Sequence, residues 1–360
     1  MKEYPIGLVP GPVSVPKKYA QAWLMNFGSS DLEVDFFDLY AKNQILTQKL
    51  LGTRKSVVIT SGEAMSILWG SVKSALASGD RLLAVASGLF GEGFADMARA
   101  LGFEVEAITA EYDSLPDPQR VREAALRFHP RAITAVHCET PSGTLTPLKD
   151  LGEIALEVDA LFLVDFVSSG GGVPVNVDAN HIDIGLLGSQ KALSLPPPLS
   201  ISTVSARAWD AVKKVNYAGY DAYLPWIDVP KKTYMPYTHD WHGMMALNLS
   251  LSAIMEEGMD NVFARHSRTA ALCRKLAREM GLQLFPVDET ICSATVSAFY
   301  VPESWTWEAF DAALRARGLV LGGNYGRLAG RVFRVGHMGS QADETLVSRG
   351  MEIVRDVLKK

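Results

Sequence analysis

The sequence predicts an α/β fold, with a large domain built on a mostly parallel sheet that has helices on both faces, followed by a smaller α+β domain. Between residues 56 and 204 short apolar segments alternate with segments of helical periodicity. Turns that contain glycine join the two kinds of segment. After about residue 245 the alternation gives way to two long helical segments and then to mixed strands and helices. We therefore expect an N-terminal arm over residues 1–20, the large domain over 21–245 and the smaller domain over 246–360.

The first part of the chain differs from the rest. Residues 5–16 contain too many prolines for a helix or a central strand. They predict an extended arm, which lies over the crevice of its own domain or over a neighbouring subunit. Residues 30–52 have helical periodicity, with Asp31 as a possible capping residue. A β-branched strand over 56–59 then leads through a turn into a helix over 66–76.

The same patterns predict the remaining elements. Residues 87–93 are expected to form a flexible glycine turn. In the large domain we expect further strands at 81–86, 104–108, 132–136, 161–164, 182–187 and 199–204, and helices at 94–101, 118–128, 148–156 and 206–214. Beyond them we expect helices at 243–257, 259–280, 304–316 and 341–358, and strands near 293–301, 317–321 and 331–335.

Composition argues against several classes of protein. The chain has 360 residues, 48% hydrophobic and 21% charged, which is enough for one large and one smaller globular domain. A net charge of −5 gives no basic footprint for nucleic acid. There is no N-terminal apolar segment and no apolar run of membrane-spanning length, so we expect no membrane or secreted protein and favour the cytoplasm. The three cysteines are far apart and the histidines form no cluster, so neither a disulfide framework nor a metal site is expected.

Two charged residues at neighbouring strand ends form the strongest candidate site. The apolar segment 182–187 breaks at Gly188 and is followed by Lys191, and the strand over 161–164 ends in Asp165. The carboxyl ends of successive strands in one sheet converge on one crevice. Chemistry with pyridoxal 5′-phosphate (PLP) needs such a pair, because a lysine holds the cofactor as a Schiff base and an aspartate keeps its pyridine nitrogen protonated. Taken singly, Lys191 is more often a solvated surface lysine and Asp165 a helix or turn cap.

The turn after the strand at 56–59 is a candidate phosphate site. Ser61 and Gly62 precede a helix, whose start presents free N–H groups and the positive end of the helix dipole. A plain strand-to-helix turn is the simpler interpretation. Glu63 argues against a phosphate, because it places a like charge beside the anion unless its side chain points away or is held by a cation. Phe90, at another strand end, can stack on a flat heteroaromatic ring, although a core phenylalanine is the more frequent case.

Eight short motifs occur in a characteristic order: Leu8-Val-Pro-Gly-Pro12, Ser61-Gly62, Gly88-Leu-Phe-Gly91, His137-Cys-Glu-Thr140, Val164-Asp165, Gly188-Ser-Gln-Lys191-Ala192, Pro236-Tyr-Thr238 and Gly330-Arg-Val-Phe-Arg334-Val-Gly336. Together they resemble the class V, fold-type I PLP-dependent aminotransferases, in the branch of alanine–glyoxylate, serine–glyoxylate and serine–pyruvate aminotransferases. The resemblance covers nearly the whole chain. It implies the fold of these transferases, PLP as cofactor, a homodimer and a ping-pong transfer of an amino group.

The resemblance also implies a role for each matched position. Lys191 forms the Schiff base and moves the substrate's α-proton, while Asp165 pairs with the pyridine nitrogen. Arg334 binds the substrate carboxylate, a role that suits its planar, bidentate guanidinium. The remaining cofactor-binding positions lie at the phosphate (Ser61, Gly62, Glu63, Gln190 and Thr238, which reaches across from the second subunit) and at the ring (Phe90, Thr140 and Val167).

Three departures from the family pattern bear on phosphate and substrate binding. Glu63 replaces the small or neutral polar residue that is common after Ser-Gly. Pro141 lies inside the Glu-Thr-Pro-Ser-Gly turn, and His239-Asp240 follow Thr238 where proline is frequent. These departures leave the details of phosphate binding and the shape of the substrate mouth open.

The expected reaction moves the amino group of alanine or serine to glyoxylate or pyruvate. Because segment 137–140 also resembles the 2-aminoethylphosphonate–pyruvate aminotransferases, a phosphonate donor is the first alternative. A PLP-dependent lyase or a cysteine desulfurase is the second, although none of the cysteines is near Arg334 in the sequence. A nucleotide-binding protein is the third, but the chain lacks both GxGxxG and GxxxxGK[ST].

Overall fold

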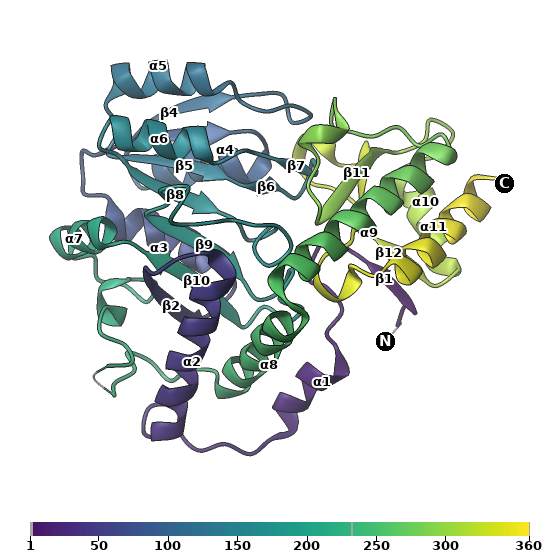
Figure 1. Cartoon of the computed structure of the whole chain (residues 1–360). Coiled ribbons are helices and arrows are strands. Elements are labelled where there is room, and N and C mark those ends of the chain that lie inside the picture. Colours follow the sequence, from purple (N-terminus) through teal and green to yellow (C-terminus); the bar gives the residue numbers. More distant parts are fainter. Residues whose placement is uncertain (1–2, 232, 360) are drawn as a thin grey trace.

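The computed structural model describes residues 3–231 and 233–359 (Figure 1). A larger α/β part contains the main sheet, and a smaller α+β part lies at the right of Figure 1, where the C-terminus and the first strand meet. The α/β fold with a mostly parallel sheet and a smaller α+β part is confirmed. No helix among the described residues combines the length and the apolar character needed to cross a membrane.

The larger part is built on a seven-stranded sheet with the order β2-β10-β9-β8-β5-β3-β4. Every pairing in it is parallel except those of β10, which runs antiparallel to both of its neighbours. The strands are β2 (Ser56–Ser61), β3 (Arg81–Ala86), β4 (Glu104–Thr109), β5 (Ala132–Val136), β8 (Leu161–Asp165), β9 (Ile184–Gly188) and β10 (Leu199–Val204). A short hairpin of β6 (Cys138–Glu139) and β7 (Thr144–Leu145) follows β5.

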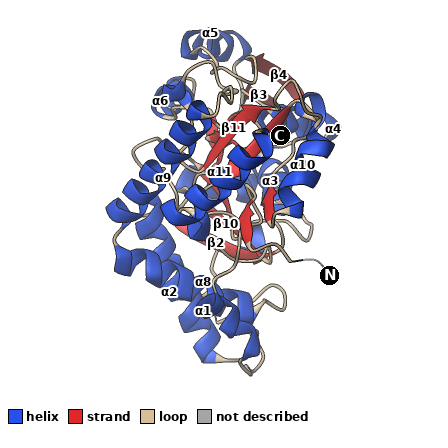
Figure 2. Cartoon of the chain, turned by 90° about the vertical axis from the view of Figure 1, so that its right-hand side faces the viewer, coloured by secondary structure: helices blue, strands red, loops and turns tan. Residues whose placement is uncertain are grey.

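Helices cover both faces of this sheet, as Figures 1 and 2 show from two directions. One face is covered by α5 and α6, which pack together, and the other by α3 and α4, with α7 packed on α3. The helices of this part are α2 (Val34–Leu51), α3 (Met65–Ala75), α4 (Leu89–Ala100), α5 (Pro118–Phe128), α6 (Lys149–Glu157) and α7 (Ala206–Val215), after the short α1 (Lys17–Ala20).

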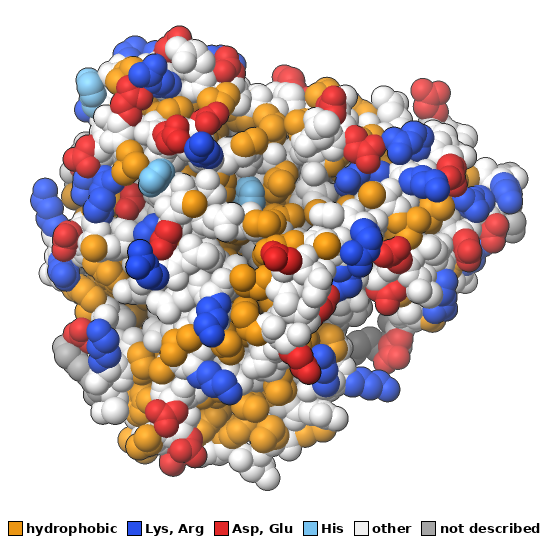
Figure 3. Space-filling view, in the orientation of Figure 1, with side chains coloured by type: hydrophobic (Ala, Val, Ile, Leu, Met, Phe, Trp, Pro, Cys, Tyr) orange, Lys and Arg blue, Asp and Glu red, His pale blue; other side chains and the backbone are white. Residues whose placement is uncertain are grey.

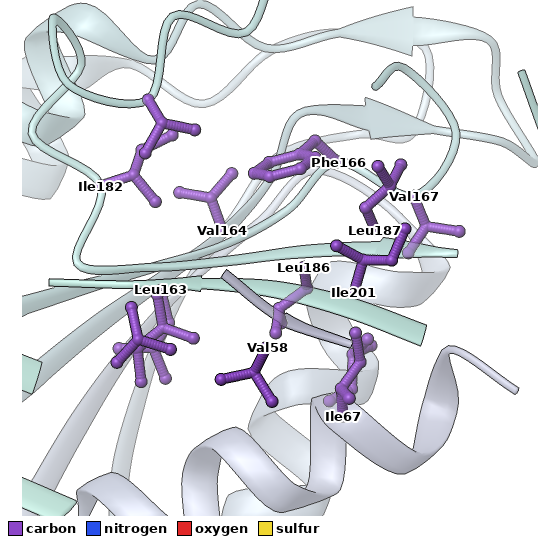
Figure 4. Close-up of a cluster of buried hydrophobic side chains, with 14 of the residues drawn as sticks. Val58, Ile67, Leu163, Val164, Phe166, Val167, Ile182, Leu186, Leu187 and Ile201 are labelled. Atoms are coloured by element: carbon purple, nitrogen blue, oxygen red, sulfur yellow. The ribbon is translucent and has the colours of Figure 1, made fainter. Parts of the chain in front are cut away.

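Successive side chains of the central strands enter apolar layers on both faces of the sheet. Figure 4 shows Leu163 and Leu186 on the side of Ile67 from α3, and Val164 and Phe166 on the opposite side. All five side chains are buried. Because helices exclude water from both faces, the strands are apolar almost throughout rather than alternating with polar residues.

The smaller part has its own apolar cluster, to which the N-terminal arm contributes. Ile6 and Leu8 of β1 (Ile6–Leu8) belong to this cluster, and β1 pairs in parallel with β12, with Ile6 opposite Leu319. Thus the predicted arm includes a short strand of the smaller part. The other elements here are α9 (Met259–Glu279), β11 (Val296–Tyr300), α10 (Trp307–Ala316), β12 (Leu319–Leu321), β13 (Val332–Gly336) and α11 (Glu344–Leu358).

Helix α8 (Trp241–Glu257) contains the predicted boundary between the two domains. Its buried Leu247, Leu251 and Ile254 belong to the apolar cluster of the larger part, and α8 packs on α2. The division of the chain into 1–20, 21–245 and 246–360 stays a prediction.

Two local predictions were wrong. Residues 87–93 are not a flexible turn before a helix at 94–101, because α4 already begins at Leu89. The carboxylate of Glu139, distant in sequence, accepts the N–H groups of Phe90 and Gly91 and so satisfies the start of the helix. Asp31 does not cap α2: the helix begins at Val34, and the Asp31 carboxylate accepts hydrogen bonds from the hydroxyls of Ser29 and Ser30 instead.

Phe166 provides a test of the packing between β8 and β9. Its side chain is fully buried, and a Cβ placed on Gly185 would lie 2.5 Å from its Cε1 atom. Phe166→Ala is expected to lower the free energy of unfolding by about 3–5 kcal/mol, because it removes apolar contacts and leaves a cavity. Guanidinium denaturation of the protein without added cofactor measures this. The control is Val287→Ala at a 69% exposed side chain, expected within about 0.5 kcal/mol of the parent; equal losses for the two variants would contradict the packing argument.

Candidate active site

The parallel pairing of β8 with β9 brings Asp165 and Lys191 together. Asp165 is the last residue of β8 and lies opposite Leu186 of β9, while Lys191 follows three residues after the end of β9. Both side chains line a cavity of about 300 Å³ at the carboxyl ends of these strands. Open parallel sheets bind their ligands in this position.

Seven of the residues singled out in the sequence line this cavity: Glu63, Phe90, Thr140, Asp165, Val167, Gln190 and Lys191. The sequence interpretation missed others, among them Cys138, Ser168 and the arm residues Gly11 and Pro12. Cys138 and Ser168 could have been suspected, because each lies within three residues of a predicted strand end. Gly11 and Pro12 belong to the predicted arm, which was expected to lie over the crevice of its own domain or over a neighbouring subunit, and the structure places both residues at the crevice.

Lys191 lies under the N-terminal arm. Its Nζ donates a hydrogen bond to the carbonyl oxygen of Pro10. A Cβ on Gly11, where φ is +104°, would lie 2.4 Å from Lys191 Cδ, so the arm approaches this closely only with glycine at that position. Burial, reinforced by the positive charge of Arg334, lowers the pKa of Lys191 to about 8, while Asp165 acts in the opposite direction. A substantial neutral fraction therefore exists near neutral pH, and the neutral amine is the nucleophile.

Asp165 is the acidic partner at the cavity. Its Oδ1 accepts the N–H of Val167 at 2.7 Å, which fixes the carboxylate. Burial raises the pKa of Asp165 to about 6, against the opposing effects of that N–H and of Lys191. A buried carboxylate of this kind is stabilised when a cationic group, such as a protonated ring nitrogen, comes next to it.

Phe90 and Thr140 are positioned by a buried polar group and a hydroxyl pair. Phe90 lies in the first turn of α4, and the Glu139 carboxylate that accepts its N–H is fully buried, so that desolvation raises the pKa of Glu139 to about 8. The hydroxyl of Thr140 forms a hydrogen bond with that of Ser168. Both side chains reach the cavity from elements that the core holds rigidly.

Ser61 and Thr238 lie outside the large cavity. They line a separate hollow of about 20 Å³, which has room for about one water molecule. The N–H of Asp240 donates to Ser61 Oγ at 3.2 Å. Gly62 does not line the cavity either, and its N–H donates to the carbonyl of Pro198 at 2.7 Å. The structure therefore does not bring these three predicted phosphate residues into the cavity of Lys191.

Arg334 lies on β13, in the smaller part. Its side chain is buried, and its Nε and Nη2 both donate to the carbonyl oxygen of Gly323, at 2.8 and 2.5 Å. The guanidinium lies 5.0 Å from the ring centre of Tyr325. Arg334 does not line the cavity, but it is close enough for its charge to lower the pKa of Lys191. The site thus faces a fixed cation from the smaller part.

The cavity fits the ring of a pyridoxal cofactor better than it fits the phosphate. An amine (Lys191), a carboxylate (Asp165), an aromatic side chain (Phe90) and an apolar contact (Val167) surround one space large enough for a small heteroaromatic ring. At the start of α3, where a phosphate is expected, the Glu63 carboxylate already accepts hydrogen bonds from Gln190 and from the N–H of Met65. No group of three or more His, Cys, Asp or Glu residues among those described could hold a metal ion.

The sequence pattern of one family matches most of the chain. The sequence pattern of the family "Aminotransferase class-V" matches residues 14–327. This chain belongs to the class V aminotransferases. The proteins of this family depend on PLP, and this class V aminotransferase is a PLP-dependent enzyme as well.

Relatives and solved structures agree with the family. This class V aminotransferase is 31% identical to the pyridoxamine–pyruvate transaminase of Mesorhizobium japonicum, over 87% of this chain and 81% of that protein. It is 30% identical to the serine–glyoxylate aminotransferase of Methylorubrum extorquens, over 94% of this chain and 87% of that protein. The crystal structure of an alanine–glyoxylate aminotransferase from Nostoc sp. superposes with a TM-score of 0.95 at 27% identity, covering 99% of this chain and 96% of that one.

The lowered pKa of Lys191 predicts an unusual pH dependence of its reactivity. Only the neutral amine reacts with an acylating reagent, so trace labelling by acetic anhydride should rise through a midpoint near pH 8. Mass spectrometry of the Lys191 peptide from cofactor-free protein measures this, with the peptides of exposed lysines as internal reference. A midpoint near the ordinary value of 10.5 would show that burial does not lower this pKa.

Proposed function

We propose that this aminotransferase moves the amino group of a small amino acid, alanine or serine, to glyoxylate or pyruvate in a ping-pong reaction. The observation that carries the proposal is the pair of Lys191 and Asp165, brought together in one cavity of about 300 Å³, with Arg334 close enough for its charge to lower the pKa of Lys191. The relatives named for serine–glyoxylate and alanine–glyoxylate transfer support the choice of small substrates.

In this proposal Lys191 has two tasks. Its Nζ would hold the aldehyde carbon of the cofactor, and as a free amine it would take up and return the substrate's α-proton. A pKa near 8 suits both tasks, because the amine can lose and regain a proton near neutral pH. PLP, when bound, supplies the electron-withdrawing ring that stabilises the negative charge developing at the α-carbon.

Asp165 and Arg334 orient the reacting groups. We assign Asp165 to the pyridine nitrogen, where its carboxylate favours the protonated, electron-withdrawing ring. Two of the N–H groups of Arg334 hold the Gly323 carbonyl, which fixes the guanidinium, and others of its five N–H groups can bind a substrate carboxylate. Phe90 and Val167 are assigned to the ring and Thr140 to its hydroxyl side.

The alternatives fit the cavity less well. A phosphonate donor brings a dianion, yet Glu63 and Asp165 line the cavity and Lys191 is the only cation that does so among the described residues. A desulfurase needs a reactive thiolate, and the cysteine at this cavity, Cys138, is buried, so that desolvation raises its pKa to about 11.

The surface favours a homodimer, which we propose as the functional state. Figure 3 shows hydrophobic side chains gathered over the end of the molecule formed by α1, α2 and α8. Near this end, Leu24, Leu32 and Val34 are 84%, 79% and 67% exposed, which is unusual for a monomer's surface. Thr238 is exposed as well, and we assign it to the phosphate region of the partner subunit.

The three free cysteines are consistent with a cytoplasmic protein.

Substitution of the two central residues tests the proposed roles. Lys191→Ala is expected to abolish turnover and to leave no reducible adduct after borohydride treatment, whereas Asp165→Asn should lower kcat by about 10²-fold or more. Because burial raises the pKa of Asp165 to about 6, the folded protein disfavours its ionised form at pH 7. Asp165→Asn should therefore keep or raise the melting temperature of the cofactor-free protein at pH 7. A fully active Lys191→Ala protein would refute the assignment.

A half-reaction screen tests the substrates. The yellow enzyme is mixed with single amino acids, and its absorbance is followed as the cofactor takes up the amino group. Alanine or serine should discharge the colour at least about tenfold faster than larger amino acids, because the cavity of about 300 Å³ also has to hold the ring. Discharge by 2-aminoethylphosphonate alone would replace the proposal by the first alternative. Elimination of a β-substituent without nitrogen transfer would replace it by the lyase.

A further inference from the structure

The expected phosphate position carries a negative charge that belongs to the chain itself. Glu63 lies in the turn between β2 and α3, where the start of the helix attracts anions. Its Oε2 accepts the N–H of Met65 at 2.9 Å, and its Oε1 accepts Nε2 of Gln190 at 2.8 Å. The carboxylate thus takes the helix N–H and the amide donor that a bound phosphate would use.

The neighbouring donors are also engaged within the protein. The N–H of Gly62 donates to the carbonyl of Pro198, and the N–H of Ser66 to that of Glu63. Nε2 of Gln190 faces the carboxylate, and its Oε1, which can only accept, is buried without a hydrogen-bond partner among the described residues. The Glu63 carboxylate therefore offers acceptor oxygens at this end of the cavity.

Positive charge is missing at the same end. Among residues 3–231 and 233–359, no lysine or arginine forms an ion pair with the Glu63 carboxylate within 4.0 Å. Lys191 is the one cation among the described residues that line the cavity, and it has to be neutral to react. A phosphate monoester brings a charge of about −1.5 to −2 at pH 7 and offers mainly acceptor oxygens. At this position the phosphate would meet the like charge of the Glu63 carboxylate, whose oxygens are hydrogen-bond acceptors as well.

The chemistry of vitamin B6 sets where its 5′ substituent can lie. The ring carbon that bears the aldehyde lies between the carbon that bears the hydroxyl and the carbon that bears the 5′ arm. With that aldehyde at Lys191, the ring nitrogen at Asp165 and the hydroxyl at Thr140, as in the proposed function, the 5′ arm lies on the side away from Thr140, and we assign it to the Gln190–Glu63 pair, which lines the same cavity. A free 5′-hydroxymethyl group can donate a hydrogen bond to a carboxylate, which the dianion of a phosphate ester cannot do.

We propose that Glu63 makes the site accept the unphosphorylated vitamers, pyridoxal and pyridoxamine, besides PLP, so that free pyridoxamine serves as an exchangeable amino donor. This proposal rests on the proposed placement of the ring between Lys191 and Asp165. In the added reaction the amino group of pyridoxamine and the carbonyl oxygen of a 2-oxo acid change places, giving pyridoxal and an amino acid. The pyridoxamine carbon is oxidised to an aldehyde while the keto carbon is reduced to an amine, so no further oxidant is needed.

Binding of the two aldehydes to cofactor-free protein tests the inference. Absorbance titrations give Kd for PLP and for pyridoxal with the wild-type protein, Glu63→Gln and the control Glu303→Gln, which removes one exposed carboxylate of the smaller part. The wild-type protein should bind pyridoxal at least as tightly as PLP. Glu63→Gln, which keeps a hydrogen-bonding amide but no charge, should shift the preference towards PLP by about tenfold or more. Glu303→Gln should leave the preference unchanged.

Two results would overturn the inference: a wild-type protein that binds PLP tenfold or more tightly than pyridoxal, or an equal preference in wild type and Glu63→Gln. If circular dichroism shows that Glu63→Gln folds poorly, Glu63→Ser is titrated in its place. The expected shift towards PLP is the same. A separate assay mixes pyridoxamine with pyruvate and follows pyridoxal. If the PLP-loaded protein transfers nitrogen from alanine but no vitamer without phosphate binds, the proposed function stands and this inference fails; if no amino acid reacts either, the proposed function fails.

Discussion

The parallel pairing of β8 with β9 is the constraint on which the rest of the site depends. It buries a carboxylate and an amine at adjacent strand ends, and burial moves their pKa values towards each other, to about 6 for Asp165 and about 8 for Lys191. Neither charge is well stabilised alone in an apolar surrounding. A ring that presents a cation to Asp165 and an aldehyde to Lys191 relieves both costs, which explains why a buried pair of this kind is an attractive site for a pyridoxal ring.

The N-terminal arm links this pair to the smaller part of the molecule. Its strand β1 pairs with β12, and the following residues cross to the site. There the Pro10 carbonyl accepts a hydrogen bond from the Lys191 amine, and the N–H of Val13 donates to the carbonyl of Gln190. A Cβ on Gly336 of β13 would lie 2.2 Å from the carbonyl oxygen of Val9, so the arm passes directly against the strand that carries Arg334. One stretch of chain therefore contacts both Lys191, the proposed catalytic lysine, and the strand of the proposed carboxylate-binding arginine.

The sequence was informative where a function depends on strand ends and silent where it depends on long-range contacts. Lys191 and Asp165 could be found because apolar strands followed by a charged residue are visible in one dimension, and parallel strands bring such ends together. The start of α4 could not be predicted, because the N–H groups of Phe90 and Gly91 donate to the carboxylate of Glu139, which lies some fifty residues later in the sequence. The contact of Gly11 with the lysine could be predicted only in part, because the prolines indicated an arm over a crevice or a neighbouring subunit but not which of its residues meets Lys191.

The electrostatics of the cavity explain how one site can distinguish between two anions. In the proposed function the carboxylate of an amino acid binds to Arg334, whose guanidinium is fixed by the Gly323 carbonyl. In the further proposal the phosphate of PLP would lie next to Glu63, where the donors are already engaged. The charge of Arg334 is buried and is screened little, whereas the exposed Glu63 carboxylate acts mainly on groups in direct contact with it. In the two proposals Arg334 therefore attracts an anion, and Glu63 favours a neutral hydrogen-bond donor.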